Sequence, residues 1–233
     1  MNEDILFSSP EQVARDQQRF ISKVYSWMAS ALVITGLTAW WVASNTSLMQ
    51  FFLENRGVLI FMFIGQLLLV GSLAGWINKM SSQTATIIFV VYSILTGFVF
   101  STLFLVYTAG SLASTFLITG GMFAVMSIYG WTTGTDLTKF GSILFMLLIG
   151  LIIASIVNIF MGSTMLYWIS TYVGIFIFTG LVAYDTQKIK NMGAHVAEGT
   201  EEHRKGAIIG ALSLYLDFIN LFLMLLRIFG SRR

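Results

Sequence analysis

The sequence predicts an all-α, polytopic membrane protein with seven transmembrane helices. Of its 233 residues, 56% are hydrophobic and only 10% are charged, whereas soluble domains carry about 25% charged residues. A bilayer core of about 30 Å requires about 20 apolar residues of helix, and the chain contains seven apolar runs of that kind. Lipid must therefore form part of the solvent around this chain.

Short stretches rich in turn residues separate the apolar runs. We expect the spans at residues 24–44, 57–78, 84–107, 111–131, 140–161, 165–187 and 206–229. Residues 1–23 are polar and of mixed charge, which predicts a cytoplasmic tail. One membrane domain then covers residues 24–230.

The composition excludes several classes of function. There is no cysteine, so disulfides, thiolate metal sites and thiol catalysis are absent. The net charge of +2 includes no dense basic block, so we expect no nucleic-acid partner. The sequence also lacks the common motifs of zinc proteases, serine hydrolases and nucleotide-binding loops. We therefore expect neither an enzyme nor a bound cofactor.

The distribution of basic residues predicts how the spans are oriented, because cytoplasmic loops carry an excess of Lys and Arg. With seven crossings and the N-terminus inside, nine basic residues fall on the cytoplasmic side and four on the other. Among the nine are Arg19, Lys79 and Lys188. This predicts a cytoplasmic N-terminus and an external C-terminus.

The last span has one polar face. Its small and polar residues recur at spacings of 4, 3, 4, 3, 4 and 3: Gly206, Gly210, Ser213, Asp217, Asn220, Met224 and Arg227. This is the period of a packed left-handed helix bundle, and such a face must point at protein or water rather than lipid. In earlier spans we expect Gly71, Gly75, Ser93, Gly97 and Ser101 to mark close helix packing.

Two aspartates lie within the apolar runs. Asp217 lies mid-span in LYLDFINLF, where a carboxylate costs about 2.5–3.5 kcal/mol on insertion scales. Nothing structural requires it, which favours a functional role. Asp185, in GLVAYDTQKIK, lies near the cytoplasmic end of its span. Lys188 and Lys190 can reach the interface there, so a simple ion pair is a second interpretation of Asp185.

Two carboxylates on adjacent helices have few uses. Held close, they cannot both ionise cheaply and therefore share a proton. Held apart with water, they offer hard oxygen ligands suited to Ca²⁺. Because the proton and the cation compete, proton-gated cation passage follows. Asn220 shares the face of Asp217, and we regard Ser213, Tyr184 and Lys79 as further supporting candidates. His195 and His203 are expected to be solvated loop residues.

Two other classes of protein also use membrane aspartates. Intramembrane aspartyl proteases carry YD on one helix and GxGD on the next. Tyr184-Asp185 matches the first motif, but Leu216-Asp217 lacks the glycines of the second. A proton-coupled small-solute transporter would use the same two aspartates and differ in what crosses the membrane.

The segments AYDTQKIK (183–190) and ALSLYLDFINLFLMLLRIFG (211–230) resemble a bacterial member of the Bax inhibitor-1 family. The resemblance extends over nearly the whole chain, including Tyr25-Ser26-Trp27-Met28 and Tyr129-Gly130. It implies a seven-helix fold in the bacterial inner membrane, with the last helix central and surrounded by the other six. It also implies a pH-sensitive Ca²⁺ leak, in which paired Asp185 and Asp217 form a latch and contact Ca²⁺ transiently.

In that latch, the hydrogen-bonded pair closes the path and the ionised, separated pair opens it. Some family members have a basic residue near the end of the second helix that bonds one aspartate, a position that Lys79 would fill here. The family also includes proteins similar to a regulator of the membrane protease FtsH. Such a partner would bind the tail or the 188–205 loop. Apart from the lipid bilayer and such a protease, we expect no partner, and we expect a monomer.

Overall fold

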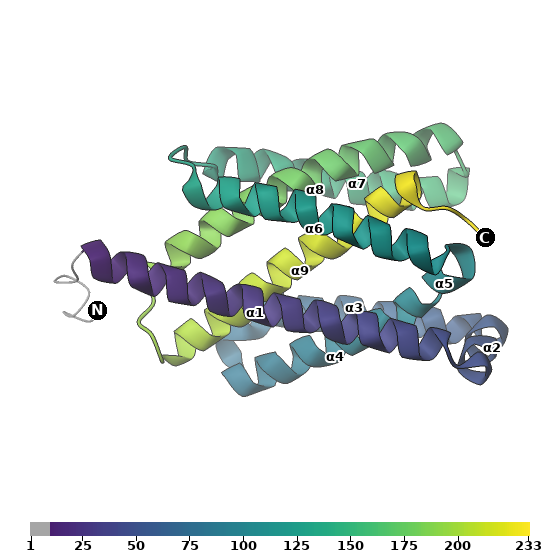
Figure 1. Ribbon diagram of the computed structural model, residues 1–233, viewed down its shortest axis with the longest axis horizontal. Helices are drawn as coiled ribbons and strands as arrows, with labels where there is room; N and C mark the ends of the chain where they lie inside the picture. The colour runs from purple at the N-terminus through teal and green to yellow at the C-terminus, as the bar shows by residue number, and fades with distance from the viewer. Residues whose placement is uncertain (1–9) are drawn as a thin grey trace. The chain divides into compact units, whose positions relative to one another are not determined.

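The structure is a computed structural model that describes residues 10–233, in which every regular element is a helix (Figure 1). Seven of the helices in this range are long and apolar enough to cross a membrane. The predicted class, an all-α polytopic membrane protein with seven spans, is confirmed. The first nine residues of the predicted tail lie outside the described residues.

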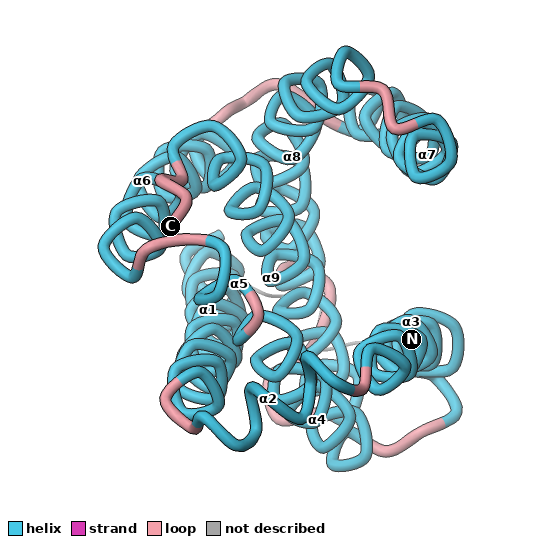
Figure 2. Tube along the Cα trace, turned by 90° about the vertical axis from the view of Figure 1, so that its right-hand side faces the viewer, coloured by secondary structure: helices cyan, strands magenta, loops and turns pink. Residues whose placement is uncertain are grey.

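The helices follow one another with short connections (Figure 2). Their bounds are α1 (Pro10–Ala43), α2 (Thr46–Glu54), α3 (Arg56–Trp76), η2 (Ile77–Lys79), α4 (Ser82–Ser101), α5 (Leu103–Val106), α6 (Ala109–Thr132), α7 (Thr138–Met161), α8 (Thr164–Gly193) and α9 (Glu201–Phe229). Side-chain oxygens cap several helix starts. Ser81 accepts from the amide of Thr84 at 3.1 Å, and Thr200 accepts from the amide of His203 at 3.2 Å.

Five of the seven spanning helices are longer than the apolar runs that predicted them, whereas α3 ends at Trp76 and α4 at Ser101, before the predicted ends at 78 and 107. α1 is already helical at Pro10, and α8 continues to Gly193, six residues beyond the predicted end of its span. A hydropathy criterion measures only the part of a helix that lipid contacts. The predicted loop at 45–56 also contains a helix, α2, whose start is capped by Asn45 accepting from the amide of Leu48 at 3.1 Å.

The chain forms two compact units. Unit 1 contains the chain up to Val106, then Lys190–Tyr215 and Arg233. Unit 2 contains Tyr107–Ile189 and Leu216–Arg232. Helix α9 therefore contributes its first half to unit 1 and its second half to unit 2. Of the spans, α9 is the most buried: 72% of its apolar window is enclosed, against at most 44% elsewhere. Its central position stays a prediction.

In unit 1, α4 packs against both α1 and α3. The α1–α4 contact is close because Gly97 has no side chain: a Cβ there would overlap the side chain of Thr38. One turn away, the Thr35 hydroxyl bonds the Ser93 carbonyl at 3.0 Å and the Tyr215 hydroxyl at 2.7 Å. These hydrogen bonds join α1, α4 and the first half of α9.

The small residues predicted to mark packing fall into two groups. Ser93, Gly97 and Ser101 are buried on one face of α4, as predicted. For Gly71 and Gly75 the prediction is wrong, because both are exposed and a Cβ at either would meet nothing within 4 Å. Spacing alone does not say whether a small-residue face meets protein or lipid.

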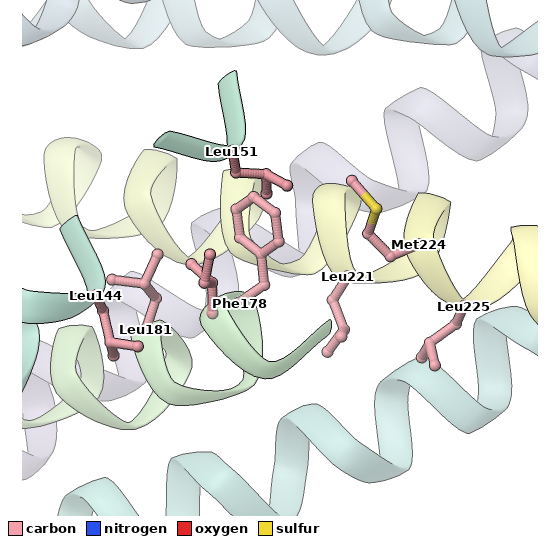
Figure 3. Close-up of a cluster of buried hydrophobic side chains, with 8 residues drawn as sticks. Leu144, Leu151, Phe178, Leu181, Leu221, Met224 and Leu225 are labelled. Atoms are coloured by element: carbon pink, nitrogen blue, oxygen red, sulfur yellow. The ribbon is translucent and has the colours of Figure 1, made fainter. Parts of the chain in front are cut away.

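Unit 2 is built from α6, α7, α8 and the second half of α9. Its core consists of aliphatic and aromatic side chains from α7, α8 and α9 (Figure 3). The members are Leu144, Leu151, Ile177, Phe178, Leu181, Leu221, Met224 and Leu225. Glycines allow the helices to approach closely. A Cβ on Gly130 of α6 would collide with the carbonyl of Ala183, and one on Gly180 of α8 would collide with Leu144.

A glycine at a close helix contact, Gly97, can be compared with a glycine that faces open space, Gly71. We expect Gly97→Ala to lower the free energy of unfolding by about 1–3 kcal/mol, the usual cost of overpacking. Gly71→Ala should change it little or raise it slightly, because alanine favours helix and meets open space. Thermal melting of the purified protein in detergent measures both. Equal losses would contradict the α1–α4 contact described above.

Candidate functional site

Asp185 and Asp217 lie together in unit 2, one on α8 and one on α9. Their side chains are hydrogen-bonded to each other. Asp217 is 5% exposed and Asp185 is partly buried. A carboxylate can only accept a hydrogen bond, so a bond between two carboxyl groups requires a proton on one of them. The structure therefore brings the two predicted site residues together as one hydrogen-bonded pair.

The segment that carries Asp185 is held by two neighbouring helices. On α6, Gly130 allows the backbone to reach the carbonyl of Ala183. On α7, Gly141 lies against the ring of Tyr184. Lys188, one turn beyond Asp185, is close enough to interact with it electrostatically. This interaction accompanies the bond to Asp217, and the simple ion pair predicted for Asp185 stays a prediction.

The supporting candidates are placed differently. Tyr184 lies beside the pair in sequence and packs against the core of unit 2. Asn220 is partly buried, and its amide donates to the carbonyl of Leu216 at 2.8 Å, within its own helix. Ser213 and Lys79 belong to unit 1, where Ser213 is partly buried and Lys79 is exposed. Supporting roles for Ser213 and Lys79 stay predictions.

The pair limits what kind of metal the site could hold. The described residues contain no cluster of three or more His, Asp or Glu side chains that would bind a metal ion. A cation at the pair would therefore take its remaining ligands from hydroxyl, carbonyl or water oxygens. That chemistry fits a hard cation such as Ca²⁺ better than a transition metal.

The connection between α8 and α9 is tied to the rest of unit 1, a feature that the sequence analysis missed. The carboxylate of Glu201 accepts from the Ser82 amide at 2.6 Å and from its hydroxyl at 2.9 Å. Arg19 of α1 bonds Glu198 at 2.8 Å, and this bond lowers the pKa of the Glu198 carboxyl. Two residues of the predicted 188–205 loop are therefore anchored to other helices of unit 1, and a partner at this loop stays a prediction.

The prediction that His203 is solvated is wrong. It is 4% exposed, and its ring meets the edge of Phe20 with centroids 5.0 Å apart. The reason is that α9 begins at Glu201, so His203 lies in its first turn and faces α1. Its Nδ1 has no hydrogen-bond partner among the described residues. The polar face that begins at Gly206, extended one turn toward the N-terminus, would have indicated this burial, because His203 lies three residues before Gly206.

The other end of α9 carries Arg227. Its guanidinium donates to the Thr171 hydroxyl at 3.3 Å and lies 4.9 Å from the centre of the Tyr167 ring. Beyond the helix, the chain folds against the start of α6, where the Thr108 amide donates to the carbonyl of Ser231 at 3.1 Å. Residue Ser231 thus lies beside the start of α6, and the side of the membrane on which the C-terminus lies stays a prediction.

Seven apolar helices and a hydrogen-bonded pair of carboxyl groups between two of them define a polytopic α-helical membrane protein with an internal acidic site. A family model described as "Inhibitor of apoptosis-promoting Bax1" matches residues 17–233. The chain is 51% identical over 217 residues to the inner membrane protein YbhL of Escherichia coli strain K12, covering 93% of each. The chain belongs to the Bax inhibitor-1 family.

Two uncharacterized proteins of other bacteria are also similar to this chain. One uncharacterized protein of Borreliella burgdorferi is 45% identical over 217 residues, which cover 93% of this chain and 94% of the relative. Another, from Deinococcus radiodurans, is 36% identical over 234 residues, which cover 97% of this chain and all of the relative. The likeness therefore extends over whole chains rather than over the two aspartate segments alone.

The contact between Glu201 and Ser82 can be tested by substitution. We expect Glu201→Ala to lower the melting temperature by a few degrees, because it removes both bonds to the first residue of α4. The matched control is Glu202→Ala, since Glu202 is an exposed neighbour in the same first turn of α9. If the two substitutions have the same effect, Glu201 does not cap α4.

Proposed function

We propose that this protein is a pH-sensitive Ca²⁺ leak channel of the bacterial inner membrane, gated by the pair of Asp185 and Asp217. The observation that carries the proposal is their hydrogen bond. This hydrogen bond joins α8 and α9, and both helices are long and apolar enough to span a bilayer. Carboxyl groups inside a membrane are costly and mark ion or proton pathways.

The gate works through the shared proton. With the proton in place, the two side chains hold α8 and α9 together and the path is closed. When the proton leaves, two carboxylates face each other in a poorly solvated place and repel. Separation of the side chains then relieves the repulsion and opens the path. Calcium flux should therefore be low in acid and rise with pH.

The same charges recognise the cation. The ionised pair carries a charge of about −2, which balances one divalent cation, and its oxygens are ligands that Ca²⁺ prefers. Because the proton and Ca²⁺ require the same oxygens, acid closes the path and also removes its binding site. No resident metal is needed in this scheme, and the ion is cargo.

We favour a channel over an enzyme for a structural reason. Aspartyl proteolysis requires the substrate backbone to approach both carboxyl groups, whereas Asp217 is 5% exposed and is flanked by Leu216 and Phe218. A proton-coupled transporter of small solutes would use the same pair and would differ only in its cargo. Flux measurements with several solutes separate these two functions.

Orientation and location are part of the proposal. The excess of basic residues on one side supports a cytoplasmic N-terminus. The name of the similar E. coli protein supports the inner membrane. On this account, the Arg19–Glu198 and Glu201–Ser82 bonds face the cytoplasm and Arg227 lies toward the outside. The chain would act as a monomer, with the lipid bilayer as its required partner.

The proposal predicts the pH dependence of Ca²⁺ flux into proteoliposomes. Flux through the unmodified protein should rise from pH 6 to pH 8, by no more than about tenfold per pH unit, the limit for release of one proton. Asp217→Asn and Asp185→Asn should each lose most of this dependence, because neither variant can place two negative charges at the site.

Lys23→Gln is a suitable control, because this cation lies on an exposed face of α1, outside unit 2, and should leave the pH profile unchanged. Flux no greater than that of empty liposomes at every pH would overturn the leak proposal. The search would then turn to other solutes and to a protein partner, such as the membrane protease expected from the family resemblance.

A further inference from the structure

The side chain of Gln187 joins α8 to the connection between α6 and α7. Its Oε1 accepts from the amide of Leu137 at 2.8 Å, and its Nε2 donates to the carbonyl of Thr135 at 2.8 Å. A carboxamide has one accepting and one donating end, and here both ends bond backbone groups that are two residues apart. The connection is thereby fastened to α8 by two hydrogen bonds.

The segment that Gln187 holds is itself anchored to α7. Asp136 accepts from the amide of Thr138 at 2.9 Å and from its hydroxyl at 2.6 Å, which caps the first turn of that helix. Leu137 is 7% exposed, and its carbonyl accepts from the amide of Gly141 at 2.8 Å. Gln187 therefore ties α8 to the start of a helix rather than to a free loop.

Three contacts hold the same face of α8. Ala183 and Tyr184 meet glycines of α6 and α7, and Gln187 meets the connection between these two helices. With 3.6 residues per turn, positions 183, 184 and 187 lie within about 100° of one another around the helix. Position 185 lies about 150° from the middle of that face, where Asp185 bonds Asp217 of α9. Helix α8 is thus held from the side opposite to the carboxyl pair.

We propose that Gln187 is a positioning residue for the carboxyl pair: by fastening the α6–α7 connection to α8, it sets where Asp185 stands opposite Asp217 when the path is closed. This inference rests on the proposed function and deepens it. Gln187 acts through the backbone of α8, two residues beyond Asp185. A hydrogen bond weakens steeply as its geometry departs from the optimum. A small displacement of this part of α8 therefore weakens the bond between the two carboxyl groups.

The test compares two substitutions in the same connection. Gln187→Met removes both hydrogen bonds to residues 135 and 137 and keeps the length and the neutrality of the side chain. The matched control is Thr138→Val, which removes the hydroxyl bond to Asp136 and leaves the bonds to α8 in place. Each variant is compared with the unmodified full-length protein in lipid.

Two measurements do not depend on transport. Deuterium exchange at the amide of Leu137 should be about tenfold faster in Gln187→Met, the factor expected for one lost hydrogen bond. The infrared carbonyl band of the protonated carboxyl group at pH 6 should move to higher wavenumber, as such a band does when its hydrogen bond weakens. Thr138→Val should leave the band unchanged. A purely structural glutamine would alter the exchange rate alone.

A third measurement links Gln187 to the gate. Calcium flux into proteoliposomes at pH 6 should be about fivefold greater in Gln187→Met than in the unmodified protein, because the closed state loses about one hydrogen bond of stabilisation. Thr138→Val should give the flux of the unmodified protein. Both variants should melt within a few degrees of it, because each keeps the packing of the helices.

The inference and the proposed function fail by different results. Faster exchange at Leu137 with an unchanged carboxyl band would overturn the positioning role. Fast exchange at Leu137 in the unmodified protein would overturn it without any variant, because the bond from Gln187 would then not persist. A shifted band in Gln187→Met, with no flux above empty liposomes in the unmodified protein, would support the positioning role and contradict the leak.

Discussion

The hydrogen bond between Asp185 and Asp217 is the interaction on which the proposed function depends. Without a proton in this bond, a carboxylate on α8 would face a carboxylate on α9. One of the two, Asp217, is only 5% exposed to solvent. The surrounding helices keep the pair together: Gly130 and Gly141 let α6 and α7 approach the residues just before Asp185. These glycines thus let α6 and α7 pack closely around the segment that carries Asp185, and they help to keep its carboxyl group away from lipid.

Helix α9 joins two differently built halves. Its first half is held in unit 1 by a buried network in which Tyr215 bonds Thr35. Its second half carries Asp217 and packs with α6, α7 and α8. Tyr215 and Asp217 are two residues apart in the sequence and belong to different units.

Much of this arrangement could be predicted from the sequence, and the reasons for the remainder are physical. Span number follows from apolar length, but α2 is too short for that criterion. The residue types of Asp185 and Asp217 singled them out in the sequence, but the contact between their side chains could not be predicted. At 1.5 Å per residue, Asp217 lies about 24 Å from the start of α9 and Asp185 about 12 Å from the end of α8. Only the tertiary structure brings them level.

The shared proton can be observed directly by infrared difference spectroscopy of the protein in lipid, following the carbonyl band of protonated carboxyl groups. The account predicts one such band at pH 6 that disappears toward pH 8. It should be altered or lost in Asp185→Asn and in Asp217→Asn alike, because the proton belongs to both side chains. A spectrum with no protonated carboxyl at pH 6, or with a band that neither substitution changes, would contradict the account.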